Sequence, residues 1–263
     1  MSATDRRGGE TSTGGKSMRI ILVGYEGHMG REVRACAERT ENCEIVAGVD
    51  PMIPASGDIC KKSFAECTAE ADVIIDFSHH SMTCGLMDFA EANGLPVVLA
   101  TTGQTEEEKE RIREAETKIP VFLAANYSLG IATLTDLVKR AAALYPDGEI
   151  EIVEQHHNRK LDAPSGTALA LFNAIREVRP SAEADCGRFG QGKRRKDDVG
   201  IHAVRMGNIV GIHEVMIGTQ NERITLKHEA FSRGVFAEGA LKAAAFLAGK
   251  KPGHYDMKDL LSE

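Results

Sequence analysis

Short apolar runs alternate with amphipathic segments through the first half of the chain. The apolar runs fall at 19–23, 44–49, 73–77, 96–100 and 120–124. Segments with helical periodicity lie between them, at 29–39, 82–92 and 106–118. Strands that alternate with helices in this way form a parallel sheet through right-handed crossovers. We therefore predict an α/β fold whose first part is a doubly wound parallel sheet of the Rossmann type.

The pattern changes after Asn126. Helices are predicted at 132–143, 167–177 and 234–248, strands at 149–154, 200–204, 211–217 and 222–228, and a glycine-rich, charged loop at 187–198. This order predicts a second α/β domain with an open mixed sheet. We expect a dinucleotide-binding domain at 18–129 that is completed by 234–263, and a substrate-binding and oligomerisation domain at 130–233. Residues 1–17 are polar and lack periodicity, which predicts a disordered extension.

Composition and charge narrow the class of protein. The chain has 263 residues and a net charge of −7 at pH 7, which argues against nucleic acid or an anionic membrane as a partner. No apolar segment is typical of a signal peptide or a membrane span. The six cysteines contain no Cys-x-x-Cys pair, and His202, His213 and His228 form no metal-binding motif. We expect a cytoplasmic protein with reduced thiols, no metal and no membrane contact.

A glycine turn follows the first predicted strand and opens the first predicted helix. Gly-x-x-Gly-x-x-Gly at 24–30 permits a tight turn and lets the start of the helix approach a pyrophosphate. Asp50 ends the second strand, 20 positions after Gly30, where a carboxylate can accept hydrogen bonds from the adenosine ribose. The alternative is a turn that only packs the helix on the sheet, with Asp50 as a surface carboxylate. The two features in register favour dinucleotide binding, and the candidate cofactor residues are Gly24, Tyr25, Glu26, Gly27, His28, Met29, Gly30 and Asp50.

The segment 154–168, EQHHNRKLDAPSGTA, contains the densest cluster of candidate chemistry. Pro164 suits the first turn of a helix, where its missing N–H has no cost. The Gly166 and Thr167 amides would then be unpaired donors at the start of that helix, which is a site suited to a carboxylate. Lys160 adds a mobile positive charge on the approach to this site.

Two adjacent imidazoles, His156 and His157, precede this helix. In an extended backbone the two side chains point to opposite sides. One imidazole can therefore face a substrate while the other supports the first imidazole or binds the substrate. Adjacent histidines in a polar loop are often only solvated, and Ser-Gly-Thr before an apolar run is often an ordinary helix cap. The segment as a whole favours a pocket for a small anion with a proton donor beside it.

This segment resembles, nearly letter for letter, the signature of the 4-hydroxy-tetrahydrodipicolinate reductase family, also called dihydrodipicolinate reductase. The similarity runs from Met18 to nearly the C-terminus and includes 207–213 and 232–240. It implies NAD(P)H-dependent reduction of 4-hydroxy-tetrahydrodipicolinate to tetrahydrodipicolinate, with loss of water, in lysine and diaminopimelate biosynthesis. It also implies a homotetramer formed through the open sheet.

The resemblance further implies roles for single residues. His156 would be the proton donor and acceptor, Lys160 a second proton donor, and His157 a substrate-binding residue. Substrate binding is also implied for Ser165, Gly166 and Thr167. Two more cofactor segments follow strands of the parallel sheet, where ligands of such sheets bind. Their residues are Ala100, Thr101, Thr102, Ala124, Ala125, Asn126 and Tyr127.

Two departures from the family pattern bear on the nucleotide. His28 stands where many members carry arginine, and Pro51 follows Asp50 where an arginine would hold a 2′-phosphate. We therefore expect NADH to be preferred, with NADPH also used. Two other functions stay open, namely another Rossmann-type dehydrogenase of a small carboxylic acid and a non-catalytic dinucleotide-sensing protein. The two histidines and the lysine disfavour a sensor, which needs no proton donors.

Overall fold

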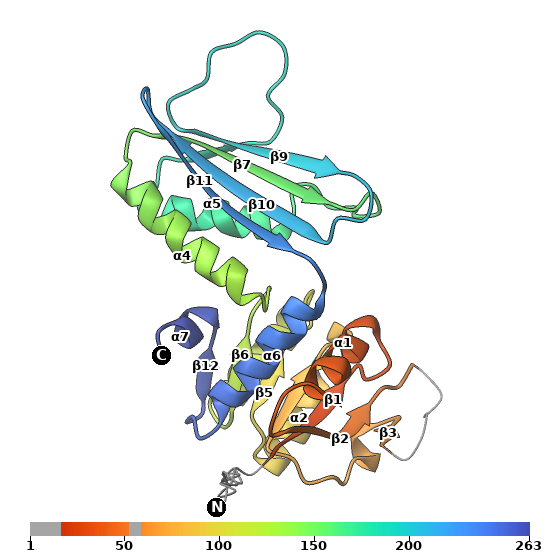
Figure 1. Cartoon of the computed structure of the whole chain (residues 1–263). Helices are drawn as coiled ribbons and strands as arrows, with labels where there is room; N and C mark the ends of the chain where they lie inside the picture. Colours follow the sequence, from red (N-terminus) through yellow and green to blue (C-terminus); the bar gives the residue numbers. More distant parts are fainter. Residues whose placement is uncertain (1–16, 53–58) are drawn as a thin grey trace, which may run out of the picture.

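Two β-sheets, each with its own helices, make up the fold (Figure 1). The computed structural model describes residues 17–52 and 59–263. The predicted disordered extension at 1–17 lies outside these residues, except for Ser17. In the part of the chain that the structure describes, no helix is both long and apolar enough to cross a membrane.

The first sheet is parallel throughout, with the strand order β12-β6-β5-β4-β1-β2-β3. Its strands are β1 (Met18–Val23), β2 (Cys43–Val49), β3 (Cys60–Lys61), β4 (Val73–Asp76), β5 (Val97–Leu99), β6 (Pro120–Leu123) and β12 (Gly253–Tyr255). The chain runs outward from β1 through β2 to β3 and then continues on the other side of β1 from β4 to β6. The predicted doubly wound parallel sheet is confirmed.

Helices cover both faces of this sheet. They are α1 (His28–Ala37), α2 (Thr83–Asn93), α3 (Glu106–Glu116), α6 (Gly234–Leu247) and the short α7 (Met257–Leu261), with 3-10 turns η1 (Phe64–Glu66) and η2 (His80–Met82). On β1, Ile20 and Leu22 pack with residues of α1 and α6, whereas Ile21 packs with residues of α2 and α3. Because successive strand side chains point to opposite faces, a strand covered on both sides needs an uninterrupted apolar run. The apolar runs of the sequence follow this rule.

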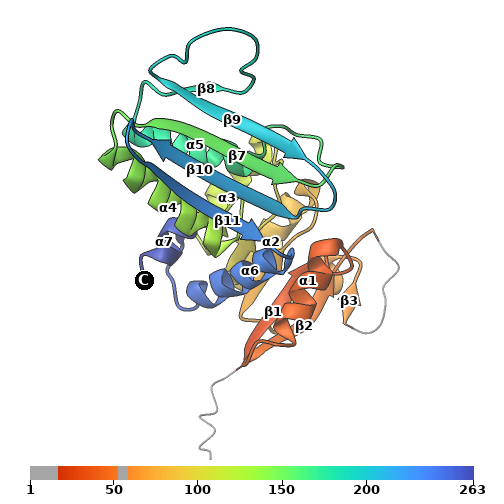
Figure 2. The same ribbon diagram turned by 45° about the horizontal axis from the view of Figure 1, so that its top comes forward.

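The second sheet is mixed and has the order β11-β10-β7-β9-β8. Its strands are β7 (Glu149–His156), β8 (Glu183–Asp185), β9 (Asp198–Arg205), β10 (Gly211–Gly218) and β11 (Arg223–Ala230). β7 pairs with β9 in parallel and with β10 antiparallel. The helices α4 (Leu129–Leu144) and α5 (Gly166–Val178) lie against one face and leave the other open (Figure 2). The predicted open mixed sheet is confirmed.

Side chains on β7 and β10 alternate between the helix-covered face and the open face. Ile150, Ile152, Val215 and Ile217 form the core under α4 and α5. The same buried rows continue toward the carboxyl end of β7 with polar residues, which are Glu154, His156 and His213. Polar groups in a buried row are expensive unless they are hydrogen-bonded, so this end of the sheet is where a site is expected.

The chain crosses between the two sheets twice. It leaves the first sheet after β6, enters α4, and returns after β11 into α6, which packs against α1. The last strand, β12, then pairs in parallel with β6. The short elements β3, β8, β12 and α7 were not predicted, because strands of two or three residues have no measurable periodicity. The division into 18–129 with 234–263 and 130–233 stays a prediction.

Candidate active site

The glycine turn between β1 and α1 is as tight as the sequence predicts. Gly24 has a φ of +78°, and a Cβ at this position would lie 2.5 Å from the Phe77 carbonyl oxygen. A Cβ on Gly30 would lie 2.2 Å from the Gly24 carbonyl oxygen. Gly27 precedes the first residue of α1, His28. The turn therefore fits a phosphate group, because it exposes the helix N–H groups and carries no side chain at its tightest points.

Asp50 lies beside this turn but is not a surface carboxylate. It is buried, and its carboxylate accepts hydrogen bonds from the Glu26 and Met52 amides, each at 3.1 Å. Arg34 Nη2 lies 3.4 Å from Glu26 Oε2, and the guanidinium lies over the Tyr25 ring. Two carboxylates thus border the end of β2, with one guanidinium beside them.

A cavity of about 300 Å³ lies where β4, β5 and β6 end. Its lining residues are Met29, Phe77, Ala100, Ala125, Asn126, Tyr127, Arg233 and Phe236. Of the predicted cofactor residues nearby, Thr101 is buried, whereas Thr102 is exposed and Ala124 half-buried. The cavity lies at the carboxyl ends of the strands, where open parallel sheets bind their ligands.

The hydroxyl group of Tyr127, one of the cavity-lining residues, is bonded within the protein. Its single hydrogen is shared between the carbonyl oxygens of Leu99 and Phe122, which lie 2.9 and 3.0 Å from the hydroxyl oxygen. Burial raises the pKa of Tyr127 well above its usual value. A neutral, doubly anchored phenol fixes the loop after β6, so the Tyr127 hydroxyl is a structural group.

The helix start predicted to bind an anion is present as α5, with one correction to its cap, and anion binding there stays a prediction. Helix α5 begins at Gly166 with Ser165 as its cap, and the Ser165 hydroxyl accepts from the Ala168 amide at 3.2 Å. Pro164 therefore precedes the cap and does not lie in the first helical turn. The prediction was wrong because the serine hydroxyl, and not proline, satisfies the end of the helix. A Cβ on Gly166 would meet nothing within 4 Å, which leaves room above the first amides.

A hydrogen bond joins this helix start to the cavity. Asn126 Nδ2 donates to Thr167 Oγ1 at 3.1 Å. Asn126 follows β6 of the first sheet, and Thr167 lies in the first turn of α5 under the second sheet. The predicted cofactor edge and the predicted anion site thus meet at one place between the two sheets.

The two histidines have different surroundings, as their alternation predicts. His156 is buried, and its Nδ1 lies 2.6 Å from Glu154 Oε2. His157 is half-buried, and its amide donates to the Ile209 carbonyl oxygen at 2.8 Å. Burial lowers the pKa of His157, and nearby positive charges, with Arg159 first, lower it further. Lys160 Nζ lies 2.8 Å from Asp162 Oδ1, so a substrate carboxylate would compete with that residue.

Three further residues belong to this site, and the sequence interpretation gave them no role. Glu154 shares the buried face of β7 with His156, because residues two apart on a strand point the same way. That spacing is a signal that could have identified Glu154. His213 comes from β10, with Nε2 at 3.1 Å from Ser165 Oγ, and Arg205 comes from β9. Only the strand pairing brings these two residues to the site.

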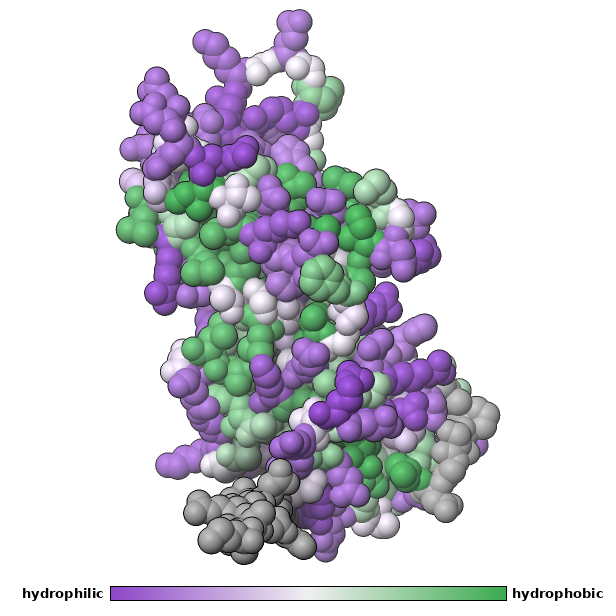
Figure 3. All heavy atoms as spheres, in the orientation of Figure 1, coloured by the Kyte–Doolittle hydropathy of each residue, from purple (hydrophilic) through white to green (hydrophobic). Residues whose placement is uncertain are grey.

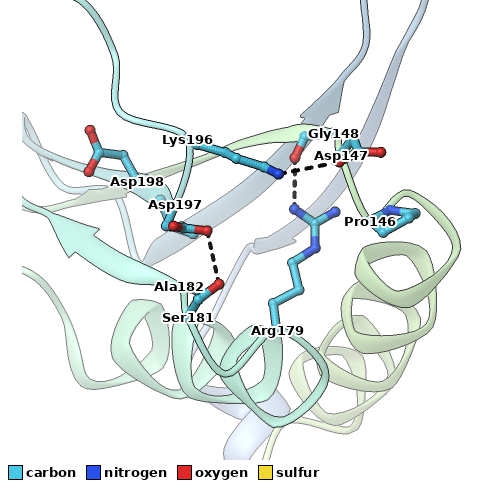
Figure 4. A pocket seen from close by; sticks show the side chains of 10 residues that line it. Pro146, Asp147, Gly148, Arg179, Ser181, Ala182, Lys196, Asp197 and Asp198 are labelled. Atoms are coloured by element: carbon cyan, nitrogen blue, oxygen red, sulfur yellow. Dashed lines mark hydrogen bonds and ion pairs between the residues drawn. The ribbon is translucent and has the colours of Figure 1, made fainter.

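A second cavity, of about 180 Å³, lies at the other end of the second sheet (Figure 4). The length of β7, roughly 23 Å at 3.3 Å per residue, separates it from His156. Arg179 in its wall donates to the carbonyl oxygens of Ala142 and Gly148, at 3.0 and 2.7 Å, and to that of Tyr145. This guanidinium is therefore occupied in holding the turn before β7.

No group of three or more His, Cys, Asp or Glu side chains that could hold a metal occurs within residues 17–52 and 59–263. A glycine turn on a parallel sheet, and a second sheet whose helix α5 is joined to the loop after β6 by the Asn126–Thr167 hydrogen bond, are the features of a two-sheet oxidoreductase of the Rossmann type. Two family models match this chain, dihydrodipicolinate reductase N-terminus over residues 18–127 and C-terminus over residues 130–261. The chain belongs to the dihydrodipicolinate reductase family, and the predicted resemblance is confirmed.

Individual relatives agree with this assignment. The chain is 47% identical over 253 residues to the 4-hydroxy-tetrahydrodipicolinate reductase of Caldanaerobacter subterraneus subsp. tengcongensis, which covers 94% of this chain and 99% of the relative. It is 44% identical over 248 residues to the protein of the same name from Clostridium tetani, with 93% and 97% covered. The solved structure of dipicolinate-bound dihydrodipicolinate reductase from Paenisporosarcina sp. TG-14 superposes with a TM-score of 0.77 at 26% identity, over 91% of this chain and 97% of that one.

Proposed function

We propose that this chain reduces 4-hydroxy-tetrahydrodipicolinate to tetrahydrodipicolinate with NAD(P)H, in lysine and diaminopimelate biosynthesis. The family assignment supports the reaction. The observation that carries it onto this chain is the contact between Asn126 and Thr167. Hydride transfer needs donor and acceptor carbons held next to each other. The contact brings the nucleotide end of one sheet against the anion site of the other.

The nucleotide is assigned to the first sheet, in a domain of residues 18–129 completed by 234–263. The turn at 24–30 and Asp50 hold the pyrophosphate and the adenosine ribose. Residues 100–102 and 124–127 border the nicotinamide end. NAD(P)H supplies the hydride when it is bound, and the residues around it orient the ring and exclude water.

The substrate is assigned to the second sheet, in a domain of residues 130–233. Its two carboxylates need two cationic or N–H-rich partners, and the Gly166 and Thr167 amides and Lys160 provide them. Ser165 shapes the first turn, and His157 borders the ring. The solved relative from Paenisporosarcina holds dipicolinate, a flat ring with two carboxylates, which supports a pocket of this kind.

Proton transfer is assigned to His156 and Lys160. The substrate loses water as its 4-hydroxyl group and a hydrogen of the neighbouring ring carbon. Addition of a hydride to the resulting unsaturated ring leaves electron density on that ring, and a nearby acid must protonate it. His156 Nε2 is the free ring nitrogen, because Nδ1 is bonded to Glu154. Lys160 acts as a second proton donor. None of these steps requires a metal.

NADH is the proposed preferred nucleotide. Asp50 and Glu26 place two carboxylates where a 2′-phosphate would add nearly two negative charges. Arg34 and Lys61 lie close by, since the Asp50 amide donates to the Lys61 carbonyl oxygen and Arg34 contacts Glu26. These positive groups make NADPH usable, so we propose a preference and not an exclusion.

We further propose a cytoplasmic homotetramer assembled through the open face of the second sheet. Half-buried apolar residues, Val153, Ile212 and Met216, lie on this face. Figure 3 shows hydrophobic and hydrophilic side chains mixed over the sheet, whereas the loop beyond β8 is mostly hydrophilic. All six cysteines are unpaired, which suits a reducing compartment.

The Lys160→Ala variant tests this function in an assay of nicotinamide absorbance with the substrate made in situ. We expect kcat/KM to fall by roughly 10²–10⁴-fold, as for other general acid–base groups, with the Kd for NADH unchanged. Lys139→Ala is the matched control, because Lys139 is a half-buried lysine on α4 whose ammonium group pairs with Glu177 outside the candidate site. A near-normal rate in Lys160→Ala would contradict the assignment. NADH binding without any turnover in the wild-type protein would favour a sensor, and turnover of another small acid alone would favour a different dehydrogenase.

A further inference from the structure

Glu154 lies behind His156, at the centre of a buried network. Its side chain is fully buried. Arg205 donates to both of its oxygens, with Nη1–Oε2 at 2.8 Å and Nη2–Oε1 at 2.7 Å. The Ser165 amide donates to Oε1 at 3.0 Å, and His156 Nδ1 completes the set. These four contacts use the acceptor capacity of one carboxylate.

The network determines which nitrogen of His156 carries the fixed hydrogen. Burial alone would raise the pKa of Glu154, but the hydrogen bonds from Arg205 and His156 hold it below its usual value. An ionised carboxylate only accepts hydrogen bonds, so Nδ1 of His156 must carry a hydrogen and donate it. Nε2 is then the atom that gains and loses a proton. A Cβ on Gly211 would lie 3.2 Å from this Nε2, so a glycine at 211 leaves the space around it clear.

The same carboxylate also holds the segment that carries Lys160. Arg205, fixed by Glu154, donates through Nη2 to the Asp162 carbonyl oxygen at 2.6 Å. Asp162 in turn contacts Lys160 Nζ. At the far end of this segment, the Ser165 amide is bonded to Glu154 directly. The segment that follows Lys160 is therefore tied to the Glu154 carboxylate at two points, at Asp162 through Arg205 and at Ser165 directly.

We propose that Glu154 is a positioning residue of the reaction, which fixes the hydrogen of His156 on Nδ1 so that Nε2 exchanges its proton with the substrate, and which holds the Lys160 loop through Arg205. This inference rests on the proposed role of His156. A merely structural ion pair is the alternative, since buried pairs can contribute little to stability. The two differ in effect, because a structural pair would affect folding and a positioning residue would affect turnover.

The test is Glu154→Gln, which keeps the shape but offers an N–H donor to His156. We expect kcat to fall by roughly 10²-fold or more, with a smaller rise in the KM for the substrate because Arg205 and the Lys160 segment are held less firmly, and with the Kd for NADH within about threefold of wild type. The His156→Gln variant should lose about as much, and the double variant should lose little more, because the two residues act as one unit. Glu116→Gln is the control, since Glu116 Oε1 bonds His254 Nδ1 at 2.7 Å far from this site. It should leave kcat unchanged.

A spectroscopic measurement keeps the proposal testable if Glu154→Gln does not fold. In wild-type protein with ¹⁵N-labelled histidine, the resonance lost in His156→Gln should show hydrogen on Nδ1 in the neutral form. Hydrogen on Nε2 instead would overturn the proposal. A normal kcat in Glu154→Gln together with a low one in His156→Gln would also overturn it and leave the proposed function intact. A normal kcat in His156→Gln would refute the proposed role of His156 itself.

Discussion

Lowering the pH from neutral to mildly acidic should destabilise this protein through one histidine, His213. The residue is 4% exposed on β10, with its ring 5.1 Å from that of His156 and its Nε2 bonded to Ser165. Burial, together with the smaller effect of the neighbouring His156, lowers the pKa of His213 from its ordinary 6.5 to about 4. Between these two values the unfolded chain binds a proton that the folded chain does not. His213 therefore costs no stability at a pH well above 6.5, and the free energy of unfolding decreases as the pH falls from 6.5 toward about 4.

The two pKa values set the size of the effect. Going from about pH 7.5 to about pH 5, they give a loss of about 2 kcal/mol in the free energy of unfolding. Burial also lowers the pKa of His157 and His228, so the wild-type protein should lose more than this in total. The His213→Gln variant removes one titrating group and keeps a side chain that can bond the Ser165 hydroxyl. The difference between the two proteins isolates His213.

Urea unfolding followed by circular dichroism measures this difference, since the chain has no tryptophan to serve as a fluorescent probe. At a fixed protein concentration, His213→Gln should lose about 2 kcal/mol less than wild type between the two pH values. His254→Gln is the control, because His254 is exposed and lies on β12. It should behave as wild type. Equal losses in wild type and His213→Gln would refute the argument that burial keeps His213 neutral.

Two further predictions concern the ligands. Pyridine-2,6-dicarboxylate should inhibit competitively against the substrate, and Thr167→Pro should weaken this inhibition markedly more than Thr167→Val. Proline removes the amide N–H, whereas valine removes only the hydroxyl group that Asn126 contacts. Equal inhibition of both variants would place the carboxylate elsewhere. The kcat/KM for NADH should exceed that for NADPH when both are measured at one fixed ionic strength. Glu26→Gln should narrow the ratio of the two kcat/KM values, because it frees Arg34 for the 2′-phosphate. A clear NADPH preference in the wild-type protein would contradict the role given to Asp50 and Glu26.

Much of the fold could be predicted because its longer elements carry strong local signals. The apolar runs of β1 and β2 and the periodicity of α1 to α3 gave the parallel sheet within a few residues. The strands that were missed, β3, β8 and β12, have two or three residues each. Their existence depends on a neighbouring strand and not on their own sequence. Pairing of β12 with β6 joins residues more than one hundred positions apart, which no local pattern encodes.

The candidate site also combines features that local sequence predicts with features that depend on the pairing of distant strands. The glycine turn and the segment 154–168 are local in sequence, so their geometry followed from spacing, apart from the position of Pro164. Arg205 and His213 reach the site only because β9 and β10 flank β7. The burial of Asp50 depends on the Glu26 and Met52 amides, which the turn presents to it. Sequence spacing predicted which residues make up the candidate site, and the contacts that hold these residues in place could be seen only in the folded structure.

The central claim is that hydride is transferred from NADH to the ring of the substrate, and an isotope experiment tests this transfer most directly. The protein is given NADH with deuterium at both C4 positions and 4-hydroxy-tetrahydrodipicolinate made in situ, and the product is analysed by mass spectrometry. We predict tetrahydrodipicolinate that carries one deuterium for each NADH oxidised. Oxidation of NADH without deuterium in the product, or no oxidation at all with this substrate, would contradict the function proposed for this chain.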